Sequence, residues 1–185
     1  MDPESIYTKT GDDGSTGRLF GGRVSKGHDL MEAVGAVDET VAALGLARAA
    51  GLDDEIADIV VRLQRELFVV GADLSSNPRA RDRLSPGLSE VTAEMVDALE
   101  QTIDHLVAAH PLRSVFIVPG ATSASAAIDL ARTMVRRAER RAVAARESGS
   151  PVSEACATYL NRASDLLYVI ARVAAGEDQE PASHE

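Results

Sequence analysis

The sequence predicts an all-α protein, a bundle of five helices that follows an extended glycine-rich N-terminal segment. Hydrophobic residues make up 45% of the 185 residues but aromatic residues only 3%, so alanine, leucine, valine and isoleucine must fill the core. Alanine and leucine favour helices, whereas the aromatic residues that strands prefer are scarce. Apolar residues also recur at helical spacing in five long stretches. A chain of this length builds one domain, which we assign to residues 1–185.

The N-terminal segment comprises residues 1–27. Its part from residue 7 onward holds six of the fourteen glycines and shows neither helical nor strand periodicity. Glycine-rich backbone of this kind forms shaped, extended loops. We assign the bundle to residues 28–175. The remaining residues, 176–185, form a polar tail that we expect to be loose.

The predicted helices cover residues 29–50, 53–74, 89–110, 123–147 and 153–175. Asp29 is the expected N-cap of the first helix, and Gly51 closes it. The third helix is expected to begin at Ser89 and to end before Pro111, which cannot continue a helix. Long helices joined by short connections are typical of a bundle.

Two connections and the single cysteine complete the predicted fold. Residues 75–87 are polar, charged and bounded by prolines, which is typical of an exposed loop. Residues 114–119, with the sequence SVFIVP, are apolar enough for a strand but have no partner strand, so we expect a buried connector. Cys156 excludes an internal disulfide and is expected to be a small buried hydrophobe.

The charge distribution limits the possible partners. A formal net charge of −10 disfavours a nucleic-acid surface, because phosphate backbones are bound by basic patches. Lys9 and Lys26 are the only lysines, and six of the seventeen arginines lie between residues 132 and 146. Positive charge gathered in two places suits a small anionic ligand. The sequence has no membrane-length apolar run and no hydrophobic signal core, so we expect a cytoplasmic protein without a membrane partner.

An arginine stripe marks the fourth predicted helix. Arg132, Arg136 and Arg140 stand four residues apart and therefore line one helix face. Like charges at this spacing repel one another unless anions lie over them, either carboxylates of a neighbouring helix or the phosphates of a ligand. The alternative is a charged face exposed to solvent.

The N-terminal segment offers a second group of anion-binding donors. Its glycines let backbone N–H groups approach an anion, and Thr8, Thr10, Ser15 and Thr16 add hydroxyl donors. The segment lacks the order of glycines, lysine and hydroxyl residue that defines a P-loop. It predicts either a phosphate-binding loop of another kind or a flexible surface loop.

Polar residues also interrupt the apolar faces of the first and fifth predicted helices. Asp38 and Glu39 lie in the first helix, and a stripe of Asn161, Ser164, Asp165 and Tyr168 lies in the fifth. Buried carboxylates need partners, so these residues either fix helix register through salt bridges or contact a ligand. The histidines are dispersed and predict no metal site.

Six segments stand in order along nearly the whole chain: IYTKTGDDG at residues 6–14, AVGAVDE at 33–39, LFVVGADLS at 67–75, FIVPG at 116–120, ARTMVRRAERR at 131–141 and YLNRASDLLYVIAR at 159–172. Together they closely resemble the PduO-type corrinoid adenosyltransferases. The resemblance implies a ferritin-like five-helix bundle that assembles as a homotrimer with active sites at subunit interfaces. It also implies transfer of the 5′-deoxyadenosyl group of ATP to cob(I)alamin, giving adenosylcobalamin and triphosphate.

The resemblance also implies roles for individual residues. The implied ATP-binding residues are Thr8, Lys9, Thr10, Gly11, Asp12, Thr16, Gly17, Lys26, Arg136, Arg137, Ala138, Glu139, Arg140 and Asn161. Arg132 is similar to the arginine that pairs across the subunit interface with the helix-one aspartate, here Asp38. Phe116 matches the aromatic residue that shields the lower face of the corrin and thereby eases reduction to cobalt(I). The Mg²⁺ ion enters through the ATP phosphates and has no direct protein ligand.

The implied chemistry explains why no serine or cysteine nucleophile is needed, because cobalt(I) is itself the nucleophile. The expected partners are a reductase and an adenosylcobalamin-dependent enzyme. An ATP-binding cobalamin carrier or sensor without turnover is the alternative function. The sequence departs from the usual family pattern at Thr40 and Val41, where Leu-Asn is frequent, at Ala121, where a glycine is common, and at Asp129, where a histidine is common.

Overall fold

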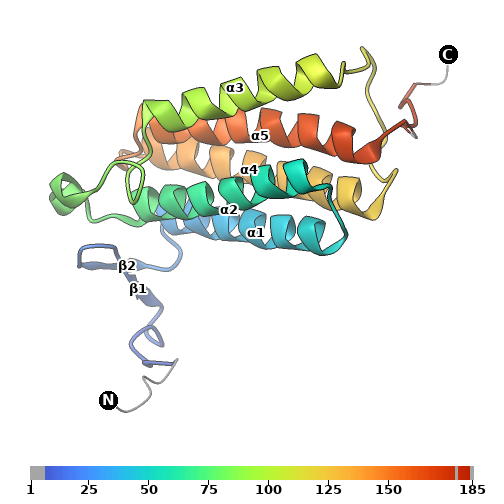
Figure 1. Cartoon of the computed structure of the whole chain (residues 1–185). Helices are drawn as coiled ribbons and strands as arrows, with labels where there is room; N and C mark the ends of the chain where they lie inside the picture. The colour runs from blue at the N-terminus through green and yellow to red at the C-terminus, as the bar shows by residue number, and fades with distance from the viewer. Residues whose placement is uncertain (1–6, 178, 184–185) are drawn as a thin grey trace.

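The computed structural model describes residues 7–177 and 179–183 and confirms the all-helical prediction (Figure 1). Five long helices are present: α1 (Asp29–Ala49), α2 (Asp54–Ser75), α3 (Ala93–Ala109), α4 (Ser123–Glu147) and α5 (Glu154–Ala175). A small antiparallel hairpin of β1 (Ser15–Gly17) and β2 (Arg23–Ser25) precedes them, and a short 3₁₀ helix, η1 (Pro78–Arg83), follows α2. Residues 1–6 of the predicted N-terminal segment and residues 178, 184 and 185 of the predicted tail lie outside the described residues.

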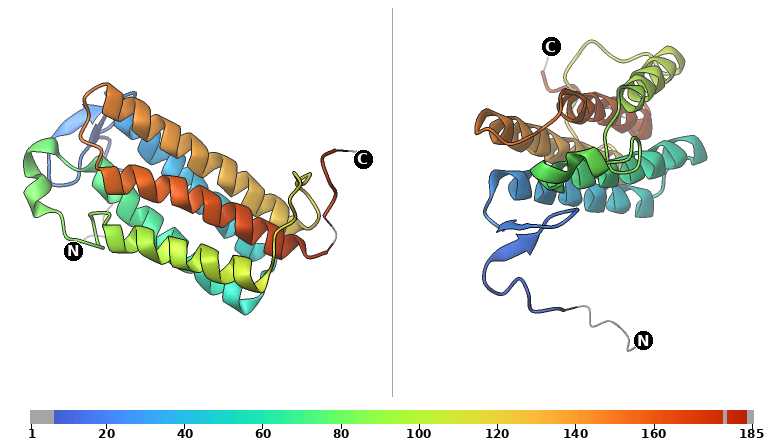
Figure 2. Two further views of the ribbon diagram at one scale, coloured as in Figure 1. Left: turned by 90° about the horizontal axis from the view of Figure 1, so that it is seen from above. Right: turned by 90° about the vertical axis from the view of Figure 1, so that its left-hand side faces the viewer.

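The helices α1, α2, α4 and α5 pack side by side, and α3 packs against α5 (Figure 2). Successive long helices run in opposite directions, so the bundle has two ends (Figure 1). The hairpin, η1 and the α4–α5 turn lie at one end, which we call the hairpin end. The other end, which we call the connector end, carries the α1–α2 turn, the segment of residues 110–122 and the C-terminal tail.

Two helix N-caps differ from the prediction. The N-cap of α1 is His28 instead of Asp29, and its Nδ1 accepts a hydrogen bond of 3.1 Å from the backbone N–H of Leu30. The predicted start of the third helix at Ser89 is wrong, because Thr92 caps α3. Ser89 instead closes a turn in which its hydroxyl accepts from the N–H of Ser85. The end of α1 before Gly51 is confirmed, and Gly51 has the positive φ of 93° expected there.

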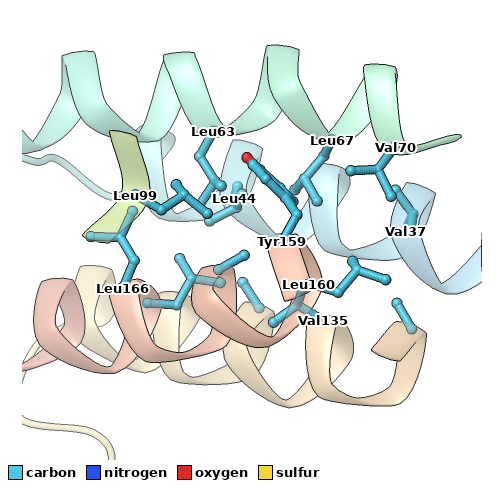
Figure 3. Close-up of a cluster of buried hydrophobic side chains, with 14 of the residues drawn as sticks. Val37, Leu44, Leu63, Leu67, Val70, Leu99, Val135, Tyr159, Leu160 and Leu166 are labelled. Atoms are coloured by element: carbon cyan, nitrogen blue, oxygen red, sulfur yellow. The ribbon is translucent and has the colours of Figure 1, made fainter. Parts of the chain in front are cut away.

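The core is built mainly from leucine, valine, isoleucine and alanine, as the composition predicts. Figure 3 shows its centre, where the labelled side chains are Val37, Leu44, Leu63, Leu67, Val70, Leu99, Val135, Tyr159, Leu160 and Leu166. Small alanines at Ala131, Ala138 and Ala142 on α4 are fully buried. Such residues let neighbouring helices approach closely, which explains how a chain so poor in aromatic residues fills its core.

Cys156 is buried, as predicted. Burial is the main cause that raises the pKa of its thiol far above the ordinary value. The protonated thiol is a poor nucleophile, so Cys156 acts as a packing residue.

Tyr159 is the one large aromatic residue buried at the centre of the described core, and its hydroxyl donates a hydrogen bond of 2.7 Å to Oε2 of Glu66. Burial first, and then the charge of Glu66, raise the pKa of this phenol well above its ordinary value of 10.0. Above pH 10 the unfolded chain therefore loses a proton that the native protein keeps, so stability falls as the pH rises.

We expect Tyr159→Phe to cost about 1 kcal/mol at neutral pH through the lost hydrogen bond. The variant should also lose less stability than the wild type between pH 9 and about pH 11, because it has no phenol to ionise on unfolding. Urea unfolding at several pH values measures both effects. Equal pH dependence in the two proteins would contradict the assignment of alkaline destabilisation to Tyr159.

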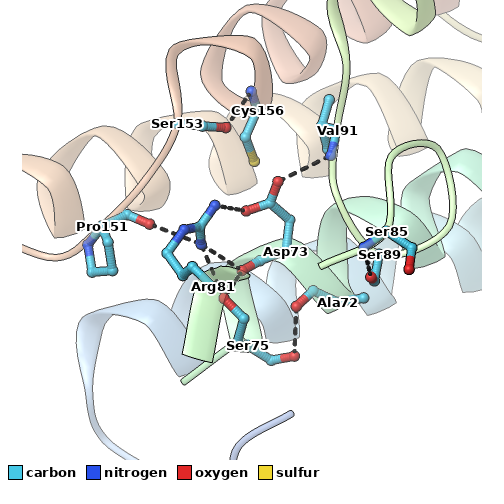
Figure 4. A network of polar contacts seen from close by, with 11 residues as sticks. Ala72, Asp73, Ser75, Arg81, Ser85, Ser89, Val91, Pro151, Ser153 and Cys156 are labelled. Atoms are coloured by element: carbon cyan, nitrogen blue, oxygen red, sulfur yellow. Dashed lines mark hydrogen bonds and ion pairs between the residues drawn. The ribbon is translucent and has the colours of Figure 1, made fainter. Parts of the chain in front are cut away.

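The segment between α2 and α3 is not simply the exposed loop that the sequence predicts. Asp73 is only 1% exposed. Its Oδ1 forms an ion pair of 2.7 Å with Arg81, and its Oδ2 accepts a hydrogen bond of 3.0 Å from the N–H of Val91 (Figure 4). Arg81 also donates to the hydroxyl of Ser76 and to the carbonyl of Pro151. Most of the segment is exposed, as predicted, but Arg81 and Ser76 form a polar network with the buried Asp73 that fastens the loop to the bundle.

The prediction of a buried connector at residues 114–119 is wrong. Phe116 is 86% exposed and Val118 is 43% exposed. The partner that the segment lacked in the sequence is the C-terminal tail: the N–H of Val118 donates to the carbonyl of Glu180, and that of Ala182 donates to the carbonyl of Phe116, each over 2.8 Å. The described tail residues are consequently held in place, which contradicts the prediction of a loose tail.

Candidate functional site

The glycine-rich N-terminal segment folds into turns that lead into the hairpin. Lys26 Nζ donates a hydrogen bond of 2.8 Å to the carbonyl of Gly11, and the hydroxyls of Thr8 and Thr10 lie 2.8 Å apart. Hydrogen bonds from Ser15 lower the pKa of Asp13. The segment therefore has a defined shape, in which Lys26 is held against the backbone at Gly11 and the hydroxyls of Thr8 and Thr10 contact each other.

The hairpin is anchored to the end of α2. The N–H of Leu19 donates to the carbonyl of Ser75, and its carbonyl accepts from the N–H of Asn77. The side chain of Asn77 donates to the carbonyl of Gly21 over 3.0 Å. These contacts position the hairpin through the same loop that Asp73 and Arg81 hold.

A groove of 490 Å³ lies between α1 and α2 beside the hairpin. Thr16 and Lys26 line it together with Asp38, and its apolar wall includes Phe68, which is 64% exposed. Among the residues that the structure describes, no arginine lines this groove. The structure thus brings together Thr16, Lys26 and Asp38, three of the residues that the resemblance implies, without the arginine stripe.

The arginine stripe lies along the exposed side of α4. Arg136 and Arg140 are exposed and make no ion pair with any residue that the structure describes. Arg137, in contrast, is ion-paired with Glu39 of α1. Ala138 is buried against the bundle. Of the two adjacent carboxylates Asp38 and Glu39 on α1, Glu39 thus joins two helices, whereas Asp38 is exposed and lines the groove.

The polar stripe of α5 meets α4 beside the arginines. Asn161 Nδ2 donates a hydrogen bond of 3.0 Å to Oε1 of Glu139, and Asn161 Oδ1 accepts one of 2.7 Å from Arg162. The structure therefore places Asn161 next to Glu139, two further residues of the predicted nucleotide site.

Arg132 contacts Asp129 and not Asp38 of its own chain. Its Nε lies 3.3 Å from Oδ1 of Asp129, and its guanidinium carbon lies 6.0 Å from the ring centroid of Tyr168. Asp129 also binds the buried Arg172 of α5. Sequence reasoning missed Arg172, although a charged residue next to the apolar run of residues 169–171 was the available signal.

The predicted site residues therefore form three separate sets in one chain. The groove set lies beside the hairpin and the arginines lie along α4, whereas the segment of residues 110–122, which contains Phe116, lies at the connector end (Figure 1). The 25 residues of α4 alone extend about 37 Å at 1.5 Å per residue, so one subunit cannot bring the hairpin to Phe116. Within the described ranges, no group of three or more His, Cys, Asp or Glu side chains is placed to hold a metal ion. None of the helices described there is long and apolar enough to cross a membrane.

Comparisons with known proteins agree with the resemblance. The family model of cobalamin adenosyltransferases matches residues 6–174. A corrinoid adenosyltransferase of Mycobacterium tuberculosis is 43% identical over 171 residues, which cover 91% of this chain and 88% of the relative. The corrinoid adenosyltransferase PduO of Salmonella typhimurium is 40% identical over 169 residues, and the chain spans about half the length of that protein.

Solved structures show the same fold. A variant of a PduO-type ATP:corrinoid adenosyltransferase from Lactobacillus reuteri, complexed with cobalamin and ATP, superimposes with a TM-score of 0.82 at 29% identity and covers 96% of this chain and 97% of that one. Another variant of that enzyme, complexed with ATP, gives a TM-score of 0.82 at 26% identity over 97% of this chain and 100% of that one. With a family model over nearly the whole length, relatives above 40% identity and a shared fold, the chain belongs to the cobalamin adenosyltransferase family.

Proposed function

We propose that this protein transfers the 5′-deoxyadenosyl group of ATP to cob(I)alamin, giving adenosylcobalamin and triphosphate. The observation that carries the proposal is that two arginines of the stripe, Arg136 and Arg140, are exposed one helical turn apart without carboxylate partners among the described residues. Two cations one helical turn apart repel each other unless an anion lies over them. A triphosphate supplies that anion.

The reaction makes the triphosphate a leaving group. The cobalt(I) centre of cob(I)alamin attacks the ribose 5′ carbon, a cobalt–carbon bond forms, and the bond from that carbon to the triphosphate oxygen breaks. The electron pair leaves with the triphosphate, whose growing negative charge the arginines and the Mg²⁺ bound to the ATP phosphates stabilise. The protein therefore needs positive charge and orientation at this site more than a nucleophile of its own.

The N-terminal segment supplies the second half of the proposed ATP site. Lys26 and the hydroxyl groups of Thr8, Thr10 and Thr16 would bind phosphate or ribose oxygens, and the glycines would let backbone N–H groups approach them. Lys9, Gly11, Asp12 and Gly17 belong to the same proposed loop. On the other half, Arg137, Glu139 and Asn161 flank the two exposed arginines.

We also propose a homotrimer with each active site between two subunits. The separation of the hairpin from Phe116 in one chain supports this assembly, since a second subunit is needed to complete the site. Asp38, exposed beside the hairpin, would pair with Arg132 of the neighbour. The exposed ring of Phe116 would then meet the corrin of cobalamin and exclude an axial ligand from its lower face.

Activity can be tested by mixing the protein with ATP, Mg²⁺ and chemically reduced cobalamin under anaerobic conditions. The proposal predicts that the absorption bands of adenosylcobalamin appear and that one triphosphate is released per product. Binding of ATP and cobalamin without product would contradict the transferase and favour a carrier or sensor. An unchanged melting temperature in a large excess of MgATP would contradict ATP binding altogether, because a ligand of the native state raises its stability.

A further inference from the structure

A buried charged cluster joins α4 to α5 beside the proposed interface arginine. It consists of Asp129 with two arginines, Arg132 on the same helix and Arg172 on α5. Asp129 and Arg172 are each only 5% exposed, whereas the side chain of Arg132 is 27% exposed. The cluster therefore has a buried part, the Asp129–Arg172 pair, and a part that reaches the surface, Arg132.

The two oxygens of Asp129 are divided between the arginines. Oδ2 accepts from the guanidinium of Arg172, and Oδ1 accepts from Nε of Arg132 over 3.3 Å. The buried Nε of Arg172 has no hydrogen-bond partner among the described residues, so Asp129 is the acceptor that compensates this cation. The Arg172 contact to Oδ2 therefore orients the carboxylate of Asp129. Removing either member of this buried pair would leave an uncompensated charge.

The ring of Tyr168 supports both guanidinium groups. Their central carbons lie 6.0 Å (Arg132) and 5.4 Å (Arg172) from the ring centroid. An aromatic face attracts cations at this distance and restricts their movement. Arg132 is thus held through its Nε and its ring contact, while its terminal nitrogens form no hydrogen bond or ion pair with the residues that the structure describes.

The charges of the cluster do not cancel. One carboxylate faces two guanidinium groups, which leaves one positive charge in excess at the exposed end of the cluster. The terminal N–H groups of a guanidinium form a planar fork that fits a carboxylate in bidentate geometry. The cluster is therefore complementary to one additional carboxylate.

We propose that Asp129, anchored by Arg172, is a positioning residue that holds Arg132 so that its free terminal nitrogens face Asp38 of the neighbouring subunit. This inference rests on the proposed function, because it assigns the orientation of Arg132 in the interfacial site to a residue that contacts neither substrate. Arg172 acts one step further away and fixes the carboxylate that does the positioning.

The variant that tests this role is Asp129→Leu/Arg172→Met, which removes the buried pair without leaving a buried charge. Replacing a buried ion pair by apolar residues is often neutral for stability, so the double variant should fold. We expect its kcat/KM for ATP to fall about 10- to 100-fold, the range set by loss of a hydrogen bond to a charged group. Arg172→Met alone retains the Asp129–Arg132 contact and should lose less activity.

A merely structural role is separated from positioning by repeating the change in an Arg132→Ala background. If Asp129 acts through Arg132, the double change should lower kcat/KM by no more than about twofold once Arg132 is absent, because coupled residues are not additive. Loss of the same factor in both backgrounds would overturn the inference. Wild-type kinetics of a folded Asp129→Leu/Arg172→Met protein would overturn it as well.

One control and one replacement variant make the outcome decisive. Tyr159→Phe loses a buried hydrogen bond far from Arg132 in the sequence and should keep wild-type kinetics, which excludes general destabilisation as the cause. If the double variant does not fold, Asp129→Asn is measured instead, with and without Arg132→Ala. We expect it to lower kcat/KM for ATP several-fold when Arg132 is present. An inactive wild type would overturn the proposed function and this inference together, whereas an active wild type with additive losses would overturn this inference alone.

Discussion

Replacing Arg136 by alanine is expected to lower kcat/KM for ATP about 100- to 1,000-fold, the range seen when one preorganised donor to a developing anion is removed. The leaving triphosphate gains charge as the cobalt–carbon bond forms, and Arg136 is, with Arg140, one of the two exposed arginines of the stripe proposed to stabilise it. The loss should appear in kcat more than in KM, because the interaction strengthens toward the transition state.

A matched control lies on the same helix. Arg146 is exposed in the last turn of α4, beyond the proposed site, and Arg146→Ala should keep its activity within about twofold, as expected for a surface substitution. Equal losses in the two variants would show that a general reduction of positive charge matters and not the position of Arg136. Wild-type activity of Arg136→Ala would exclude this arginine from the ATP site.

Asp73→Ala is expected to destabilise the protein by about 3 kcal/mol and to lower its melting temperature by about 10 °C. The substitution removes the acceptor for both the Arg81 guanidinium and the N–H of Val91 at the hairpin end. Because the loop beyond α2 also carries the backbone contacts to Leu19, the hairpin should become more susceptible to proteolysis.

Glu100→Ala provides the comparison for this prediction. Glu100 forms an exposed ion pair with Arg162, and exposed pairs contribute at most about 1 kcal/mol. In thermal unfolding, the melting temperature should therefore fall much further in Asp73→Ala than in Glu100→Ala. A similar small shift in both would contradict the view that the Asp73 network fastens the loop to the bundle.

The helices could be predicted from the sequence because their periodicity is strong and local. The predicted range of α4 agrees with the structure at both ends, and α1, α2 and α5 agree within one or two residues. The misplaced start of α3 has a local cause, since Ser89 and Thr92 are both good caps and only the fold shows that Ser89 closes a turn.

The conformation of residues 114–119 could not be predicted, because the residues that pair with this segment lie about sixty positions further along the chain. Residues 116–118 pair with tail residues 180–182, whose polar sequence suggests disorder when considered alone. The exposure of Phe116 in one chain is equally invisible to sequence patterns, which treat an apolar residue as buried. Non-local pairing decides the first feature, and the proposed assembly would account for the second.

The candidate site was predicted in part. The resemblance named residues that the structure does gather, such as Lys26 with Asp38 and Asn161 with Glu139. Residues that act through others carry no sequence signal of their own, so Arg172 was missed and Asp129 was noticed only as a departure from the family pattern. Their connection becomes visible once α4 and α5 are packed together.

The central claim, that two subunits share each active site, is tested most directly by mixing two inactive variants. Lys26→Ala impairs the hairpin half of the site, and Arg136→Ala impairs the α4 half. In a ring of three subunits every mixed trimer has one of its three sites with both halves intact, so purified mixed trimers should show about a third of wild-type activity.

The two variants are co-expressed with different affinity tags, the mixed trimers are purified, and the formation of adenosylcobalamin is compared with that of each parent and of the wild type. Recovery well above the sum of the parents is the predicted result. Activity no higher than that of the parents, in trimers shown to contain both variants, would place both halves of the site in one chain and contradict a shared active site.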